Sequence, residues 1–458
     1  MKILYIIYLI YYLFKVILTN FFMSETIKKK INTLFDKKGL SGFTENNIDI
    51  SLLYHDEDII ELINKDEYDM LINVKNKIDG LEDCKLWDKT KKLSNEYELI
   101  YLPNKKMKTS SISRYEPLSR SYFKLWEIIH DFELISINSP IKMAGLAEGP
   151  GGFIEACINY RKKFKNTCEK DKVYGITLKS SDKDIPGWNK ATNFLKKNPN
   201  VEISYGADGT GNIYNIDNIK HFASLFKKDV DLITADGGFD FSTNFNKQEQ
   251  SSLQIIFCEI VSALSIQKKG GAFVCKVYDT YTHMSISFLY LLNCLYENVY
   301  LTKPFTSRPA NSEKYIVCKG FLGISDKLLQ KLYIIVKSWD WISNKNNVVY
   351  QIIDYKKISP IFIEKIKEFN TKYFRHQVCN IEKTLEYIQK FRENKEYDTS
   401  DVYNKIIKKQ VYLAFSWCKK YKCKINYESE LIKKGYLDNL NIKIPTHKRY
   451  TQKNPHSF

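Results

Sequence analysis

Residues 141–155, IKMAGLAEGPGGFIE, are the segment that most constrains the fold of this chain. The apolar run 141–147 is typical of a buried parallel strand. Turn residues follow at 149–152, and the apolar spacing after Phe153 predicts an amphipathic helix. The segment therefore predicts a strand, a glycine-rich turn and a helix N-terminus in direct succession.

Such a turn can also hold a ligand. Glycines let the backbone approach a bound group closely, and a helix N-terminus offers free N–H groups and the positive end of the helix dipole. We therefore expect a site for an adenosine-type cofactor, with an ordinary strand-to-helix turn as the alternative. The turn lacks the G-x-G-x-x-G spacing and the second strand has no terminal acid, which argues against a dinucleotide-dependent dehydrogenase.

Strand and helix patterns alternate through the middle of the chain. Further apolar strand patterns occur at 172–178, 201–205, 229–235, 271–278, 298–303 and 314–321. Helical patterns lie between most of them, notably at 247–268 and 283–295. This alternation predicts an α/β fold with a mainly parallel sheet, helices on both faces and ligand binding at the carboxyl ends of the strands.

The flanking segments have different patterns. We expect five parts, which are an apolar leader 1–22, a helical N-terminal region 23–105, the α/β domain 106–323, a helical C-terminal region 324–445 and a basic tail 446–458. The polar composition of the tail is typical of disorder. The leader is long enough to span a membrane, but Lys15 interrupts it and Met23 could be the natural start, so it is either an anchor or a translation artefact.

The charge balance is strongly basic, with 70 Lys and Arg against 53 Asp and Glu and a formal net charge of +17. This excess favours a polyanionic partner, with nucleic acid preferred over an anionic membrane surface. None of the ten cysteines belongs to a Cys-x-x-Cys pair. The sequence therefore predicts neither a metal site nor a disulfide framework, and it fits a reducing compartment.

Four ionisable residues occupy revealing positions in the α/β domain. Lys124 lies in the helix before the first strand, and Asp236 ends the strand DLITAD. Lys276 lies in the strand GAFVCKV, and Glu313 opens the strand EKYIVCKGF. A lysine between apolar strand residues is costly unless it is paired. Each residue alone has an ordinary structural explanation, but two lysines and two carboxylates at one sheet edge indicate a catalytic group.

Five blocks of the sequence form a recognisable series, namely SRSYFKL, LAEGPGGF, DLITADGG, GGAFVCKV and SRPANSEKYIVCKGF. Between about Leu118 and Phe321, this series resembles the FtsJ-like RNA ribose 2′-O-methyltransferases. Within this family, the residues of the five blocks are most similar to those of the cap-1 mRNA 2′-O-methyltransferases of eukaryotes and large DNA viruses. The resemblance implies a Rossmann-like, seven-stranded sheet with an antiparallel last strand, and S-adenosyl-L-methionine as cofactor. It also implies a catalytic tetrad of Lys124, Asp236, Lys276 and Glu313.

The chemistry of such a family gives each tetrad residue an expected role. Methyl transfer from a sulfonium to a ribose hydroxyl needs an aligned 2′-oxygen that loses its proton. Burial near Lys124 is expected to lower the pKa of Lys276, which makes Lys276 the candidate general base. Asp236 would position Lys276, Glu313 would hold the amine arrangement and the ribose, and Lys124 would steer the 2′-oxygen.

The resemblance also assigns cofactor contacts. The turn residues that would line the methionine and ribose are Ala147, Glu148, Gly149, Pro150, Gly151, Gly152 and Phe153. Ser119 is expected near them. The second strand ends in GITLKS, without the acid that often binds the ribose hydroxyls in this family. On the adenine side, Asn212 and Ile213 occupy the family's contact positions, with Asp208 as the nearby alternative.

Substrate contacts are expected from basic side chains on RNA phosphates. The candidates are Lys105, Lys106, Lys108, Arg114 and Arg308. Resemblance to the cap enzymes adds Asn246, Lys247 and Gln248. For any single lysine, a solvated basic face is the alternative interpretation.

The resulting expectation is an intracellular, S-adenosylmethionine-dependent methyltransferase that acts on the first transcribed nucleotide of capped mRNA. Other capping or transcription proteins are candidate partners, and nucleus, cytoplasm, viral factory and virion are candidate locations. The alternatives are the same chemistry on rRNA or tRNA, a catalytically silent RNA-binding capping subunit, and a membrane-associated protein that uses residues 3–22.

Overall fold

The computed structural model of this protein describes residues 32–35, 44–45, 48–55, 61–79, 84–102, 111–136, 138–164, 169–179, 187–238, 245–343, 347–394 and 396–437. The expected leader 1–22, the basic tail 446–458 and the candidates Lys105, Lys106 and Lys108 lie outside these residues. Among the helices that are described, none has the length and apolar character needed to cross a membrane.

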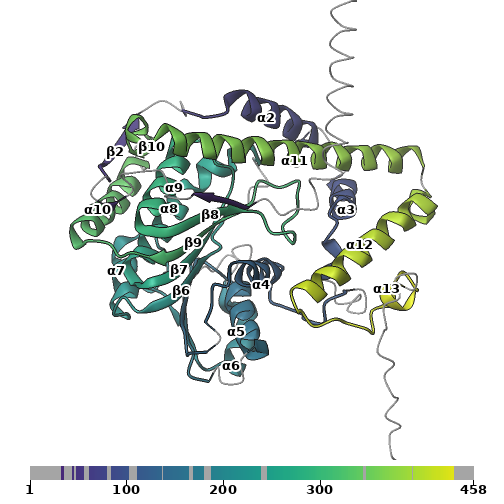
Figure 1. The fold of residues 1–458 in the computed structure, drawn as a ribbon, viewed down its shortest axis with the longest axis horizontal. Coiled ribbons are helices and arrows are strands. Elements are labelled where there is room, and N and C mark those ends of the chain that lie inside the picture. The colour runs from purple at the N-terminus through teal and green to yellow at the C-terminus, as the bar shows by residue number, and fades with distance from the viewer. Residues whose placement is uncertain are drawn as a thin grey trace, which may run out of the picture.

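An eight-stranded sheet forms the centre of the described structure, in the order β1-β8-β9-β7-β6-β3-β4-β5 (Figure 1). Seven strands lie where the sequence predicts them, namely β3 (Lys142–Leu146), β4 (Lys172–Ile176), β5 (Val201–Ser204), β6 (Val230–Ala235), β7 (Gln267–Val277), β8 (Tyr296–Thr302) and β9 (Lys314–Phe321). Neighbours from β5 to β7 pair in parallel, whereas β9 is antiparallel to both β7 and β8. The expected mainly parallel sheet with an antiparallel last strand is confirmed. The additional strand, β1 (Asn32–Phe35), pairs antiparallel with β8.

Two apolar layers bury the faces of this sheet. Phe273 and Cys275 of β7 face one layer, whereas Ala272 and Val274 face the other, as the two-residue period of a strand requires. The helices over the first face are α7 (Ile216–Ser224), α8 (Gln248–Ile266), α9 (His283–Leu295) and α10 (Asp326–Ser343) (Figure 1). Those over the second are α4 (Ser121–Phe132), α5 (Gly152–Phe164) and α6 (Thr192–Lys197).

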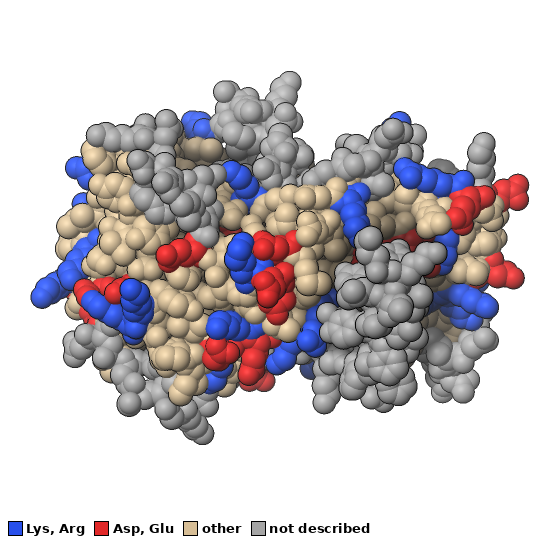
Figure 2. Space-filling model, turned by 90° about the horizontal axis from the view of Figure 1, so that it is seen from above, with Lys and Arg blue, Asp and Glu red and all other residues tan. Residues whose placement is uncertain are grey.

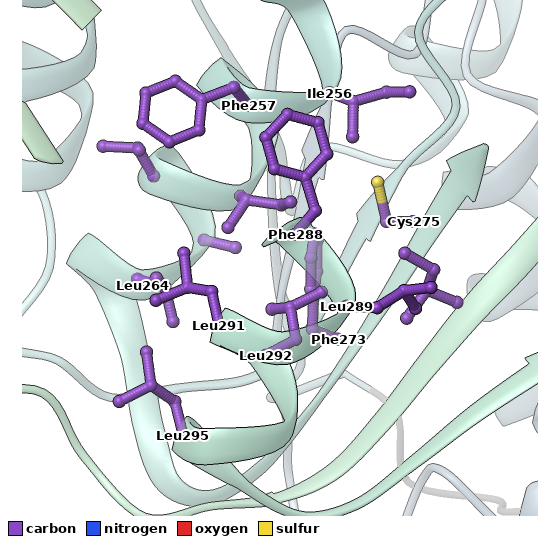
Figure 3. Packing of buried hydrophobic residues seen from close by; sticks show 14 of the residues in the cluster. Ile256, Phe257, Leu264, Phe273, Cys275, Phe288, Leu289, Leu291, Leu292 and Leu295 are labelled. Atoms are coloured by element: carbon purple, nitrogen blue, oxygen red, sulfur yellow. The ribbon is translucent and has the colours of Figure 1, made fainter. Parts of the chain in front are cut away.

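Figure 3 shows how tightly the first layer is filled. Phe257 of α8 and Phe288 of α9 stack with 5.9 Å between ring centroids, and Phe273 of β7 belongs to the same cluster. Burying such a side chain contributes about 2 kcal/mol relative to leaving it exposed. This layer therefore fixes the central strands, and with them the sheet edge at which the tetrad lies.

The flanking regions contain more than the expected helices. Besides α10 and β1, they contain the helices α2 (Lys65–Asp79), α3 (Cys84–Ser94), α11 (Pro360–Glu393), α12 (Asp401–Lys420) and α13 (Glu430–Lys433). They also form a separate two-stranded sheet that the sequence patterns do not predict, in which β2 (Ile50–His55) pairs antiparallel with β10 (Val348–Ile353). The long helix α11 runs along the α/β domain and contacts both α2 and α3 (Figure 1). The two flanking regions therefore pack on one another as well as on the central domain.

Candidate active site

The four residues of the expected tetrad come together at one edge of the sheet. Parallel pairing of β6 and β7 places Asp236, which follows β6, beside the end of β7 that carries Lys276. β9 runs antiparallel to β7 and returns to the same edge, where Tyr315 pairs with Lys276 and Glu313 immediately precedes the strand. Lys124 reaches this edge from α4, which packs on the second face of the sheet.

Two ion pairs connect the tetrad. Lys276 Nζ lies 3.2 Å from Asp236 Oδ1 and donates a 2.8 Å hydrogen bond to the Asp236 backbone carbonyl. Lys124 Nζ donates a 2.7 Å hydrogen bond to Glu313 Oε2. The Tyr315 hydroxyl donates to Asp236 Oδ1 over 3.4 Å. The four tetrad side chains are between 11 % and 15 % exposed, so each pair is largely removed from water but still reachable.

The electrostatics of the site correct one expectation. Burial by itself lowers the pKa of Lys276, but Asp236, Tyr278 and Glu313 outweigh burial and raise this pKa above its ordinary value. The expected lowering was therefore wrong, because the sequence pattern could not reveal how close the negative groups lie. For Glu313, burial by itself raises the pKa, but Lys124, Lys276 and Lys303 outweigh burial and lower this pKa to about 2. At neutral pH, Lys276 is a cation and Glu313 is an anion.

Two further residues touch the tetrad and were not singled out from the sequence. Ser307 donates a 2.8 Å hydrogen bond to Glu313 Oε1. Lys303, buried after β8, donates to the Glu313 backbone carbonyl over 2.7 Å and to the Asn311 side-chain and backbone oxygens over 2.6 and 2.9 Å. Burial, supported by Lys314, lowers the pKa of Lys303 well below its ordinary value. Lys303, like Lys276, lies at the end of an apolar strand. This sequence pattern could have identified Lys303 as a candidate site residue.

The glycine-rich turn lies at the carboxyl end of β3. Ala147 has a φ of 53°, and its N–H donates to the carbonyl of Ile176 over 2.8 Å. Gly151 has a φ of 97°, and a Cβ at this position would lie 2.5 Å from the ring of Trp188. A Cβ on Gly152 would lie 2.0 Å from Ser119 Oγ, so Ser119 is next to the turn. At Gly151 and Gly152 the turn therefore consists of backbone alone, directly at the start of α5.

The predicted turn residues divide into an accessible set and a buried set. Ala147, Gly149 and Pro150 are half-buried. The buried members are Glu148, Gly151, Gly152 and Phe153. The Phe153 ring packs against Tyr315 with 6.0 Å between ring centroids, so its side chain belongs to the core. Of this segment, the half-buried residues are the ones that can contact a cofactor through their side chains or α-carbons.

Two buried carboxyl groups lie beneath the turns at this edge. Glu259 of α8 accepts a 2.9 Å hydrogen bond from the N–H of Gly237, directly after Asp236. Burial raises the pKa of Glu259 to about 8. Glu148 lies against Gly145, where a Cβ would be 2.6 Å from Glu148 Oε2, and burial raises the pKa of Glu148 well above its ordinary value. Glu259 is therefore predominantly a neutral acid at pH 7.

The loop after β5 closes over the end of β4. A Cβ on Gly211 would lie 1.8 Å from the Thr177 carbonyl oxygen, so the two segments are in direct contact. Asn212 is exposed, and its Oδ1 accepts from the N–H of Tyr214 over 3.0 Å. Ile213 is buried in the core. The candidate adenine contact therefore falls to the exposed Asn212, with backbone rather than side-chain contact expected at Ile213.

Asp208, the alternative candidate for the adenine contact, already has several hydrogen-bond partners. Its carboxylate accepts hydrogen bonds from Thr210, Asn215 and Asn218, which lower its pKa. These bonds shape the loop that carries Asn212. Asp208 therefore supports the loop structure.

The substrate candidates are dispersed around the site. Arg114 is exposed, whereas Arg308 donates to both carboxylate oxygens of buried Glu98 over 3.1 and 2.8 Å. Asn246 donates to Asn76 of α2 over 2.7 Å. Lys247 is exposed at the start of α8, whose first residue, Gln248, is half-buried. On the face in Figure 2, acidic and basic side chains of the described residues are interspersed.

A cavity of about 400 Å³ lies between α3 and α12, next to the Arg308–Glu98 pair. Its apolar lining includes Leu93, Leu99, Leu102 and Ile407. The exposed charged residues of its lining are Lys85, Lys89 and Lys92 together with Asp88, and Lys89 pairs with Asp398 over 2.9 Å. The cavity therefore combines an apolar lining with both basic and acidic groups.

The comparisons with known proteins agree with this geometry. Residues 117–321 match the FtsJ-like methyltransferase family. Two similar proteins are named cap-specific mRNA (nucleoside-2′-O-)-methyltransferase 1. The one from Homo sapiens is 40% identical over 193 residues, 40% of this chain and 22% of that protein. The one from Dictyostelium discoideum is 31% identical over 317 residues, 65% of this chain and 39% of that protein.

The chain thus spans less than half the length of these curated relatives. The matched segment contains β3 to β9, the glycine-rich turn and all four tetrad residues. Its sheet is mainly parallel with an antiparallel last strand, and its two lysines and two carboxylates lie at one sheet edge, as the sequence predicts. Residues 117–321 therefore form an FtsJ-like methyltransferase domain.

Proposed function

We propose that this protein is an S-adenosyl-L-methionine-dependent mRNA cap ribose 2′-O-methyltransferase that methylates the first transcribed nucleotide. The observation that carries the proposal is the joining of Lys276 to Asp236 and of Lys124 to Glu313 at one edge of an FtsJ-like domain. The relatives named as cap-specific mRNA methyltransferases support capped mRNA as the substrate.

The residues at the carboxyl ends of β3 to β5 suit S-adenosylmethionine. The side chains of Trp188 and Ser119 fill the space beside Gly151 and Gly152, so neither position can carry a side chain without displacing them. Free N–H groups at the start of α5 suit a carboxylate, and Asn212 is available to an adenine amino group. When bound, the cofactor supplies an electrophilic methyl group on a sulfonium sulfur.

The tetrad would then prepare the ribose hydroxyl. Because the pKa of Lys276 is raised, we assign its ammonium group to stabilising negative charge on the 2′-oxygen, with Lys124 as a second cation. Asp236 and Glu313 hold the two ammonium groups in place through their ion pairs. The 2′-hydroxyl proton ends on solvent water in this mechanism. Lys276 is then an electrostatic catalyst in place of the general base expected from the sequence.

The neighbouring nucleotides would follow the surface from the tetrad toward the cavity between α3 and α12. Arg308 connects the two places, since it pairs with Glu98 beside the cavity and lies close enough to Glu313 for their charges to interact. The exposed lysines of the cavity lining would face RNA phosphates. Arg114, exposed and near the other end of α12, is a further phosphate contact in this proposal.

The test is transfer of a tritiated methyl group from S-adenosylmethionine to short RNAs with identical sequences and different 5′ ends. We expect label on capped RNA, at the 2′-oxygen of the first transcribed nucleotide after nuclease digestion, and little label on 5′-hydroxyl RNA. Equal labelling of both RNAs, or label at internal positions, would instead indicate an rRNA- or tRNA-type methyltransferase. Cap-dependent RNA binding without any label would indicate a silent subunit.

A further inference from the structure

The loop between β8 and β9, residues 303–313, carries Glu313 and is held by side chains from both flanking regions. From α2, Lys75 Nζ donates to Ser312 Oγ over 2.9 Å and lies 3.2 Å from Asp279 Oδ2. From α11, Gln377 Nε2 donates to Ser312 Oγ over 3.3 Å and to the Ala310 carbonyl over 3.2 Å. Both α2 and α11 lie outside the segment 117–321 that matches the methyltransferase family.

The burial of Lys75 is costly, which makes its contacts informative. Lys75 is 7 % exposed and Asp279 is 4 % exposed. Two lysines share this one carboxylate, because Lys314 Nζ also donates to Asp279 Oδ1 over 2.7 Å. Lys314 alone is sufficient to neutralise Asp279, so charge balance does not require Lys75. A second buried ammonium group at such a place stabilises little by itself.

The remaining contact of Lys75 explains its position. Its hydrogen bond reaches the side chain of Ser312, the residue immediately before Glu313. The backbone of the same loop is fixed by Lys303, which donates to the carbonyls of Asn311 and Glu313. Ser312 is therefore held from outside by α2 and α11, while Glu313 is held from inside by Lys303, Ser307 and Lys124. A shift of Ser312 would move Glu313 relative to Lys124.

We propose that Lys75 is a positioning residue of the active site, which acts through Ser312 to hold Glu313 and the Lys124–Glu313 pair. The inference rests on the proposed function for its effect on methyl transfer. Its structural part, the hold of α2 on the loop, stands independently. The N-terminal helix α2 then belongs to the catalytic unit, although the matched family segment begins after it.

Lys75→Met tests the proposal in the full chain, with Lys77→Met as the matched control. Methionine keeps the length and apolar stem of the lysine, and Lys314 still pairs with Asp279. Lys77 lies two residues further along the same helix and is exposed. We expect a fall of about tenfold in kcat for Lys75→Met, because small displacements of aligned groups are costly in rate. The KM for S-adenosylmethionine should stay within about twofold, since the glycine-rich turn is untouched.

Hydrogen exchange of the backbone amides in residues 305–316 provides a readout without substrate. Lys75→Met should speed exchange in this loop, and Lys77→Met should not. If wild-type protein methylates no RNA while Lys75→Met still speeds exchange, the proposed function fails and the structural hold of Lys75 on the loop stands. Unchanged exchange in folded Lys75→Met would overturn the inference.

Ser312→Ala decides the matter if Lys75→Met fails to fold. It removes the hydroxyl that accepts from both Lys75 and Gln377 and makes the side chain smaller. We expect a loss of kcat in Ser312→Ala alone. If Lys75→Met folds, the Lys75→Met/Ser312→Ala double variant should lose no more kcat than Ser312→Ala, because both changes break the same link. Wild-type kcat in either folded single variant, or losses that add in the double variant, would contradict the role of Lys75. So would a fall in kcat matched by an equal rise in cofactor KM.

Discussion

The turn 147–152 and the loop 303–313 border the same tetrad but are held in different ways. The turn is fixed by its own glycines and by adjacent backbone. Ala147 donates to the carbonyl of Ile176 in the neighbouring strand, and Gly152 is closed off by Ser119, which lies in the segment just before α4. These contacts, with that of Gly151 against Trp188, all come from within the matched segment 117–321.

The loop 303–313, by contrast, is held by distant elements. Glu127 of α4 accepts from the N–H groups of Phe305 and Thr306 over 2.8 and 3.3 Å, and also from Trp417 of α12 over 3.1 Å. Lys75 of α2 and Gln377 of α11 hold its other end. The half of the site proposed for the cofactor is thus held within the matched segment 117–321, whereas the half proposed for the RNA also depends on both flanking regions.

Lys276 lies where the two halves meet, so its loss should have the largest effect. Lys276→Ala is expected to lower kcat by about 10³-fold, equivalent to about 4 kcal/mol of transition-state stabilisation. Lys268→Ala is the control, because Lys268 lies on the same strand, is about half exposed and pairs with partly exposed Asp231 away from the tetrad. Tritiated-methyl transfer to capped RNA measures both. Near-normal turnover of folded Lys276→Ala would remove this residue from the chemistry.

Glu259 lies beneath the half of the site proposed for the cofactor, and its substitution tests how that half is stabilised. Its carboxyl loses a proton near pH 4.5 in the unfolded chain but near pH 8 when buried. The unfolded state therefore binds fewer protons between these values, and Glu259 makes the fold progressively less stable as pH rises through this window. Glu259→Gln keeps the acceptor for the Gly237 N–H and removes this cost. We expect the variant to be more stable than wild type by on the order of 3 kcal/mol at pH 7.

Urea unfolding at pH 4 and pH 7 measures this difference. The stabilities of Glu259→Gln and wild type should nearly coincide at pH 4, where the wild-type carboxyl is mostly protonated in both states. A stability difference that is the same at both pH values would show that Glu259 does not retain its proton in the folded protein.

Gly151→Ala tests the half of the site proposed for the cofactor, and its effect should be smaller than those of the changes at Lys276 and Glu259. Its φ of 97° strains any side chain, and the new Cβ would lie 2.5 Å from Trp188. We expect the KM for S-adenosylmethionine to rise about thirtyfold, equivalent to about 2 kcal/mol, with a smaller change in the KM for RNA. Gly270→Ala carries similar backbone strain, with a φ of 79°, but its Cβ would meet no atom within 4 Å. A rise in RNA KM alone for Gly151→Ala would contradict the proposed division of the site.

The sequence predicted much of the fold and one half of the site with good reason. Strands β3, β6, β7 and β9 have apolar runs that are readable without their partners, because burial on both faces gives a mostly apolar sequence. The pairing of β2 with β10 was not predicted, since it joins residues about 300 positions apart, in regions for which the sequence patterns predict helices. Lys75 and Gln377 were missed for the same reason, because the residues they contact are distant in sequence.

What the sequence by itself determined is the alternation of strands and helices in the α/β domain, the glycine-rich turn and, through the resemblance of its blocks, the four candidate tetrad residues, because these depend on local patterns and on residue chemistry. Only the tertiary structure decided the charge of Lys276. Burial and Lys124 alone predicted a lowered pKa, but the 3.2 Å approach of Asp236 reverses that direction. Electrostatic energy depends on distance and solvent exposure, and both are set by the folded chain rather than by its sequence pattern.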